Sequence, residues 1–110
     1  MTEFIEVRVT APSREEAERI CSAVVAERLA SCAQITGLIS STYWWNDEIQ
    51  QADEWMLLMK TTRVRFEDLA ALVQELHSYE VPEIVAVPLV AGTGDYLEWI
   101  RRETSPRPGA

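Results

Sequence analysis

Two long apolar segments joined by a short polar turn constrain the fold of this chain more than any other feature. The first runs from Cys32 to Trp45 and the second from Ile49 to Thr62, on either side of Asn46-Asp47-Glu48. Each arm has about 13 residues, whereas strands in globular proteins typically have about 5 or 6. At about 3.3 Å per residue, such an arm would extend roughly 43 Å. The pattern predicts an unusually long β-hairpin, with Gly37 as a β-bulge in its first arm.

The remaining segments alternate between strand and helix patterns. Apolar and charged residues alternate in the first strand, Ser13 and Glu16 have the spacing of a helix capping box, and Pro88 indicates an edge or bulged strand. The order β-α-β-β-α-β plus a terminal helix predicts an α+β fold of the ferredoxin-like, split βαβ type, with helices on one face of an antiparallel sheet. The predicted segments are strand 4–10, helix 13–30, helix 64–78, strand 84–90 and helix 95–103.

The length and charge of the chain limit what it can be. Its 110 residues suit a single domain, predicted over residues 1–104, followed by a disordered tail at 105–110. Eighteen acidic and ten basic residues give a net charge of -8, which argues against nucleic acid as a partner. The sequence shows no signal peptide and no membrane-spanning run, so we expect a cytoplasmic protein that binds no membrane and keeps Cys21 and Cys32 reduced.

The tip of the predicted hairpin carries three adjacent aromatic residues, Tyr43-Trp44-Trp45. Two helices of about 15 residues would each be only about 22 Å long, so the helical layer cannot cover the distal half of the hairpin. Exposed aromatic surface of this kind is expected to meet a partner. A second copy of the same chain is the simplest partner, and an outside ligand is the alternative.

These residues resemble the CutA family, which is named for divalent-cation tolerance. The similarity extends from Val9-Thr10-Ala11-Pro12 to Tyr96-Leu97-Glu98-Trp99. It is densest in four segments, Leu29–Cys32, Ser41–Trp45, Glu54–Thr61 and His77–Glu83. Taken in this order on a chain of this length, the motifs are specific.

The resemblance implies a homotrimer, an architecture shared with PII signalling proteins, and a role in tolerance of divalent metals, copper above all. The metal ligands proposed for bacterial members are a cysteine near the end of the first strand and a His-His pair. This chain has Val9 and Leu76 at two of those positions and retains only His77. We therefore expect His77, with Cys32, to bind copper or another divalent cation weakly, with no obligatory cofactor.

Each candidate residue also has a structural interpretation. His77 could instead end the second helix and pack against Tyr79, and Cys32 could be a buried thiol. Lys60 could face a small anion or lie on apolar surface, and would pair with Glu83 if the two are close. Glu48, Asp53 and Glu54 could hold a hard cation, but they are more typical of a solvated face.

Three functions remain open at this stage, a metal-tolerance trimer, a PII-like ligand-binding or signalling trimer, and a purely structural scaffold. The sequence contains no phosphate-binding loop and no nucleophile motif, so an enzyme is not expected. The residues predicted for a cleft between subunits are Tyr43, Trp44, Lys60, Tyr79 and Glu83. Trp45 and Trp55 are predicted at the oligomer interface.

Overall fold

The side chains of strand β1 (Phe4–Ala11) point alternately into the apolar core and to the opposite face of the sheet. Val7, Val9 and Ala11 have no exposed surface, and they pack with the apolar side chains of the helices. Glu6 and Arg8 alternate with them and therefore point to the other face. The alternation that the sequence shows in this segment thus decides which face of the sheet becomes the core.

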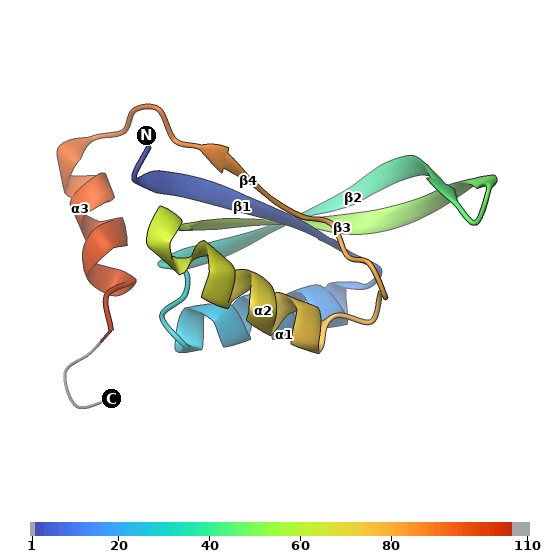
Figure 1. Cartoon of the computed structure of the whole chain (residues 1–110), viewed down its shortest axis with the longest axis horizontal. Helices are drawn as coiled ribbons and strands as arrows, with labels where there is room; N and C mark the ends of the chain where they lie inside the picture. The colour runs from blue at the N-terminus through green and yellow to red at the C-terminus, as the bar shows by residue number, and fades with distance from the viewer. Residues whose placement is uncertain (1, 107–110) are drawn as a thin grey trace.

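The computed structural model describes residues 2–106, with β1 in the interior of an antiparallel sheet of order β2-β3-β1-β4. The other strands are β2 (Cys32–Trp45), β3 (Glu48–Thr62) and β4 (Ile84–Pro88). Helices α1 (Arg14–Ala26) and α2 (Phe66–Leu76) lie on one face of this sheet (Figure 1). The arrangement confirms the predicted ferredoxin-like topology, and Pro88 lies in an edge strand as expected.

The N-terminus of α1 is capped as predicted, but only on one side. The Ser13 hydroxyl accepts a hydrogen bond from the Glu16 amide at 3.1 Å. The Glu16 carboxylate does not return to Ser13 and instead accepts two hydrogen bonds from Ser78. The reciprocal half of the predicted capping box is therefore absent, because a tertiary contact takes the carboxylate.

The helices are shorter than the apolar spacing predicted. Helix α1 ends at Ala26 because Arg28 adopts a left-handed conformation with φ 59°, and the predicted end near Ala30 is wrong. A short 3-10 turn, η1 (Arg63–Arg65), precedes α2. His77 has an extended backbone and ends α2, so the predicted range 64–78 is too long at both ends.

The hairpin of β2 and β3 is as long as predicted, with 14 and 15 residues in its strands. Its turn has two residues rather than three, because Asn46 and Asp47 both have positive φ, at 52° and 64°. Such turns match the twist of the strands that they join. The pairing shifts between Thr36 and Ile39, which confirms the bulge predicted at Gly37. The hairpin extends far beyond the helices (Figure 1).

Helix α3 (Gly94–Glu103) lies at the end of the sheet opposite the hairpin tip (Figure 1). Arg101 ties it to the start of the chain through Glu3, with a nitrogen–oxygen distance of 2.8 Å. Arg28 donates hydrogen bonds to the backbone oxygens of Arg102 and Ser105. The predicted disordered tail begins at this anchored Ser105, and its residues 107–110 lie outside the described residues.

Candidate functional site

A groove of about 700 Å³ lies between the distal hairpin and the loop that follows α2. We call it the hairpin groove. It combines aromatic residues from β2 with a carboxylate from β3 and with polar residues of the loop. Its lining residues are Thr10, Ser41, Thr42, Tyr43, Trp44, Trp45, Glu54, Ser78, Tyr79, Glu80, Val81 and Glu83.

Glu54 forms the polar floor of the hairpin groove. Only 6% of its surface is exposed, and its Oε2 accepts a hydrogen bond from the Tyr79 hydroxyl at 2.9 Å. Burial of Tyr79, together with this hydrogen bond to Glu54, raises the pKa of the Tyr79 hydroxyl above its usual value. Tyr79 therefore remains a hydrogen-bond donor, and it fixes the orientation of the carboxylate.

His77 holds the loop against the end of β1. Its Nε2 lies 2.7 Å from the carbonyl oxygen of Thr10, and its Nδ1 accepts a hydrogen bond from the Tyr79 amide at 3.0 Å. Nε2 must then carry the proton and donate it to Thr10, since a carbonyl oxygen only accepts. With both ring nitrogens engaged, the imidazole has no lone pair directed at a metal ion in this arrangement.

Glu16 completes the anchoring of the loop from the side of α1. Its Oε2 accepts hydrogen bonds from the amide and the hydroxyl of Ser78, both at 3.1 Å. The same oxygen lies 3.4 Å from Nδ1 of His77. The imidazole ring in turn packs on Tyr79, with ring centroids 4.8 Å apart. These contacts position Tyr79 over Glu54, and the packing of His77 on Tyr79 agrees with the structural interpretation of the sequence.

The three adjacent aromatic residues do not all face the same way. Glu54 pairs with Ile39 across the hairpin, so Tyr43 and Trp45, in phase with Ile39, share the face of Glu54. Trp44 pairs with Ile49 on the opposite face, and these two side chains are 70% and 62% exposed. Tyr43 and Trp45 thus enter the groove from the face of Glu54, whereas Trp44, which also borders the groove, and Ile49 keep most of their apolar surface exposed on the other face.

The structure brings together four of the five residues predicted for the cleft, and Lys60 is the exception. Lys60 pairs with Glu6 at 3.2 Å and donates a hydrogen bond to Gln34. The pair with Glu83 was expected only if the two residues were close, and that condition is not met. Lys60 and Glu6 lie on the helix-free face near the opposite end of β1, whereas Glu83 lines the hairpin groove.

Cys32 and His77, the two predicted metal ligands, lie in different parts of the chain. Cys32 of β2 pairs with Lys60 of β3, and Lys60 pairs with Glu6 of β1. His77 instead contacts Thr10, near the other end of β1. Four residues of an extended strand separate Glu6 from Thr10, which corresponds to about 13 Å. The Cys32 sulfur instead lies 3.7 Å from the Tyr96 hydroxyl. Within residues 2–106, no group of three His, Cys, Asp or Glu side chains is arranged to hold a metal ion.

The two tryptophans predicted at an oligomer interface differ in their surroundings. Trp45 lines the hairpin groove and is 43% exposed. Trp55 is half-buried against the core of its own chain, and Arg14 lies 5.2 Å above its ring. Trp45 thus retains apolar surface for a partner, whereas Trp55 already has an intrachain role.

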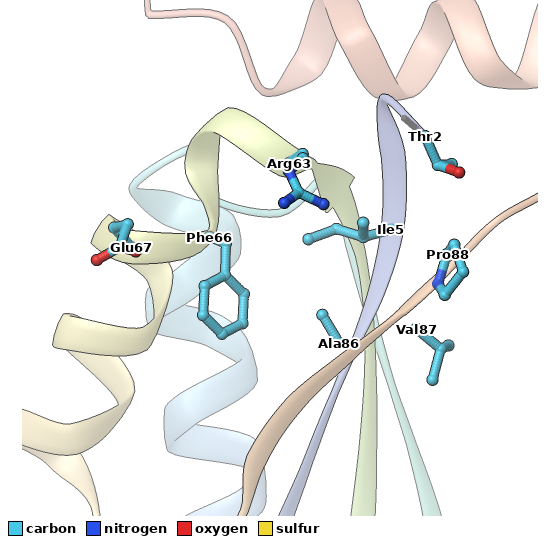
Figure 2. A pocket seen from close by; sticks show the side chains of 8 residues that line it. All are labelled: Thr2, Ile5, Arg63, Phe66, Glu67, Ala86, Val87 and Pro88. Atoms are coloured by element: carbon cyan, nitrogen blue, oxygen red, sulfur yellow. The ribbon is translucent and has the colours of Figure 1, made fainter.

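Figure 2 shows a second hollow, between the start of α2 and strands β1 and β4. Ile5 and Ala86 point from the sheet toward Phe66, and Arg63 and Glu67 provide its charged groups. Its volume is about 440 Å³. None of the predicted site residues lies here, so the hairpin groove remains the candidate site.

Sequence reasoning missed the roles of Glu54 and Glu16. Glu54 was expected on a solvated face with Glu48 and Asp53, and those two residues are indeed exposed. Glu54 instead points to the same face of β3 as Met56 and Leu58. It lies on the distal side of the bulge that β2 forms at Gly37. The shared face was visible in the sequence, but the loop that buries the carboxylate was not.

The chain matches the family model described as CutA1 divalent ion tolerance protein over residues 5–103. The divalent-cation tolerance protein CutA of Thermus thermophilus is 45% identical over 89% of this chain and 95% of that protein. A solved structure of the Thermus thermophilus divalent cation tolerance protein has a TM-score of 0.90 at 43% identity, covering 93% of this chain and 99% of that one.

More distant relatives agree with this match. Chloroplastic CutA of Arabidopsis thaliana is 38% identical over 91% of this chain, which spans about 55% of the plant protein. A solved structure of the periplasmic divalent cation tolerance protein of Archaeoglobus fulgidus has a TM-score of 0.90 at 35% identity, covering 93% of this chain and 99% of that one.

Proposed function

The chain belongs to the CutA1 divalent ion tolerance family, and from that premise we propose that it acts as a homotrimer in divalent-cation tolerance. The observation that carries the assembly is the apolar pair Trp44 and Ile49 on the outer face of the distal hairpin, which residues 2–106 leave mostly exposed. Contiguous exposed apolar surface of this kind is typical of a protein interface.

The helix-free face of the sheet supports the same assembly. Met56 and Leu58 on β3 are half-buried, and Val85 on β4 is exposed. The continuous apolar run of β3 is typical of a strand with both faces covered, yet helices cover only one face. Neighbouring subunits would supply the second cover.

We propose weak binding of a divalent cation, with copper as the ion that the family resemblance indicates. A selective copper site needs several nitrogen or sulfur ligands in a defined geometry. His77 is engaged at both ring nitrogens, and Cys32 lies far from it along the sheet. A metal site would therefore need ligands from two subunits, or a His77 ring released from Thr10.

Native mass spectrometry tests the assembly, and three chains per particle are expected. Replacing both Trp44 and Trp45 with Ser should convert most of the protein to monomer, and Gln74→Ala, at an exposed position of α2, is a control away from the hairpin. A wild-type protein that is monomeric at micromolar concentration contradicts the trimer. A double variant that stays trimeric makes the aromatic residues part of a ligand site instead.

Calorimetric titration with copper, with the cysteines reduced, tests the metal role separately. Wild type, His77→Ala and Cys32→Ser are compared. Loss of binding in either variant identifies that residue as a ligand. Unchanged copper affinity in both variants removes His77 and Cys32 from the metal site, and no measurable binding by the wild type contradicts direct metal binding.

The hairpin groove favours a second function, a PII-like role in binding a small ligand or signalling. It is already formed in one chain, and its volume of about 700 Å³ suits a small molecule. A purely structural scaffold would have no need for a buried carboxylate held by Tyr79. We propose no enzymatic activity, because the groove contains no activated nucleophile or general acid–base pair among its lining residues.

We propose that the protein acts in the cytoplasm, a location that agrees with the free thiols of Cys21 and Cys32. None of the helices between residues 2 and 106 is long and apolar enough to cross a membrane. The names of its relatives include chloroplastic and periplasmic proteins, so fractionation of cells that express the native chain is the direct test. Recovery with periplasmic or organellar markers would contradict a cytoplasmic location.

A further inference from the structure

We propose that the hairpin groove binds a small organic cation through an alkylammonium or alkylguanidinium group. In this arrangement the N–H groups of the ligand donate to Glu54, and its positive charge lies against the rings of Tyr43 and Trp45. This role rests on the small-ligand function proposed above and gives that ligand a chemical class.

The Glu54 carboxylate has one oxygen available to a ligand. The residue is 94% buried, from its exposed fraction of 6%, and Oε2 is occupied by the Tyr79 hydroxyl. Among the described residues, no side chain or amide donates to Oε1, although Glu54 lines the groove. Oε1 is not among the fully buried unpartnered atoms of the described residues, so this oxygen is open to the groove, where a donor from a ligand can replace water. A cationic N–H group in the groove is such a donor.

The side chains that line the groove carry only negative formal charges. Its lining contains three carboxylates, those of Glu54, Glu80 and Glu83, and none of the lining residues is a lysine, an arginine or a histidine. Lys60, for which facing an anion was one of two alternatives, is paired with Glu6 on another part of the sheet. The local field therefore favours a cation and opposes a small anion.

The lining of the groove suits an organic cation better than a metal ion. Hard divalent cations take six or more oxygen ligands, or several waters and phosphates, and no cluster of three ligating side chains occurs within residues 2–106. Aromatic faces, in contrast, attract ammonium and guanidinium groups by cation–π interaction. Tyr43, Trp45 and Tyr79 provide such faces beside Glu54, which makes the groove better suited to an organic cation.

The test uses four probes of similar size on the full chain. n-Butylammonium and n-butylguanidinium carry the proposed group, whereas n-butanol is neutral and n-butyrate is anionic. Binding is followed by saturation-transfer NMR and, for affinity, by titration. We expect both cations to bind and the other two to give no signal. If neither cation binds, including because a side chain of a neighbouring copy already fills the groove, the proposal fails.

Matched variants locate the binding. Glu54→Gln keeps an oxygen for the Tyr79 hydroxyl but removes the charge, and we expect it to weaken cation binding about tenfold. Asp53→Asn makes the same change at the adjacent residue, which is exposed and points to the opposite face. It should leave affinity within about twofold. Equal effects of the two substitutions would overturn the assignment of Glu54.

A second pair of variants tests the aromatic wall without touching the buried carboxylate. Tyr43→Leu should weaken cation binding several-fold, since Tyr43 shares the face of Glu54, and Trp44→Leu should weaken it less. The oligomeric state is recorded on the same samples. A trimer that binds no cation contradicts only this inference, whereas a monomer that binds cations contradicts only the proposed assembly. Weaker binding in Trp44→Leu than in Tyr43→Leu would contradict the proposed orientation.

Discussion

The proximal and distal halves of one hairpin have the same backbone pairing but opposite surroundings. In the proximal half, residues 32–36 pair with residues 56–60, and Leu57 and Met59 are completely buried beneath the helices. In the distal half, residues 39–45 pair with residues 48–54, and Trp44 and Ile49 are mostly exposed. Strand pairing alone therefore does not bury side chains. Their burial depends on the layer of helices that packs on the strands.

The two halves of the hairpin also differ in what they contribute to the protein. Apolar burial stabilises the proximal half, whereas the distal half carries the buried carboxylate and the aromatic rings of the hairpin groove. The bulge at Gly37 marks the border between them. Substitutions on the two sides of this border should therefore differ in the size and the kind of their effects.

The largest expected effect comes from the buried side of the border. Leu57→Ala should lower the free energy of unfolding by about 3 kcal/mol, because it leaves a cavity under the helices. Ile49→Ala, on the same strand but in the distal half, should cost about 0.5 kcal/mol or less in the isolated chain. Chemical denaturation at matched protein concentrations measures both. Equal losses would show that the two halves are equally covered.

A substitution at the border itself should have the next largest effect. A Cβ atom added at Gly37 would overlap the ring of Trp55, so Gly37→Ala must displace the ring. We expect a loss of about 2 kcal/mol in the free energy of unfolding. Gly94→Ala is the control, since a Cβ there meets nothing within 4 Å. A neutral Gly37→Ala would mean that the ring of Trp55 moves freely.

Replacing His77 tests whether the imidazole ring holds the loop that lies beside the distal half of the hairpin. His77→Ala removes the contacts with Thr10 and with the Tyr79 amide, and should cost about 1.5 kcal/mol even in the presence of a chelator. Gln74→Ala, at an exposed position of α2, should have little effect. Unchanged stability after His77→Ala would remove the structural role and strengthen the case for a metal ligand.

The last effect appears only at alkaline pH and is absent at neutral pH, and it concerns Cys21, on the covered side of α1. Burial raises the pKa of its thiol from 9.0 to about 11. The unfolded chain therefore loses this proton first, and the stability that Cys21 contributes falls as the pH rises from about 9 to 11. Cys21→Ala should remove this part of the pH dependence in denaturation curves measured from pH 8 to 11. An identical decline in the variant would assign it to other groups.

Thiol labelling at pH 8 gives an independent measurement of the same burial. Cys32→Ser leaves Cys21 as the remaining thiol and should react slowly until the protein is denatured, because little thiolate is present. Cys21→Ser reports Cys32, which is only half-buried. Rapid reaction of Cys21 in the native protein would show that the core under α1 opens readily.

Local pattern was sufficient to predict the topology of the fold. The alternation of β1, the two apolar arms, the bulge at Gly37 and the edge position of Pro88 all depend on neighbours in the sequence. Helix ends were less predictable, since the left-handed conformation of Arg28 ends α1 within an apolar pattern that continues to Ala30. There the local conformation overrides the spacing of the apolar residues.

The candidate site was predictable only where its residues belong to one element. Tyr43 and Trp44 were identified from their sequence, and Tyr79 and Glu83 from a motif. Glu54 and Glu16 were missed because the loop after α2 buries them, and that contact joins residues 25 and 62 positions apart. Lys60 was misplaced for the same reason, since its partner Glu6 lies on another strand.

The position of β2 at the edge of the sheet has a consequence for handling the protein. The strand has 14 residues without a proline or a lysine, and within the described chain its outer row of amides and carbonyls has no partner strand. Long apolar edges of this kind are templates for aggregation. The opposite edge, β4, is protected by its length of five residues and by Pro88. A subunit released from the proposed trimer would therefore aggregate through β2. Covering this edge in the trimer we propose would also keep the protein soluble.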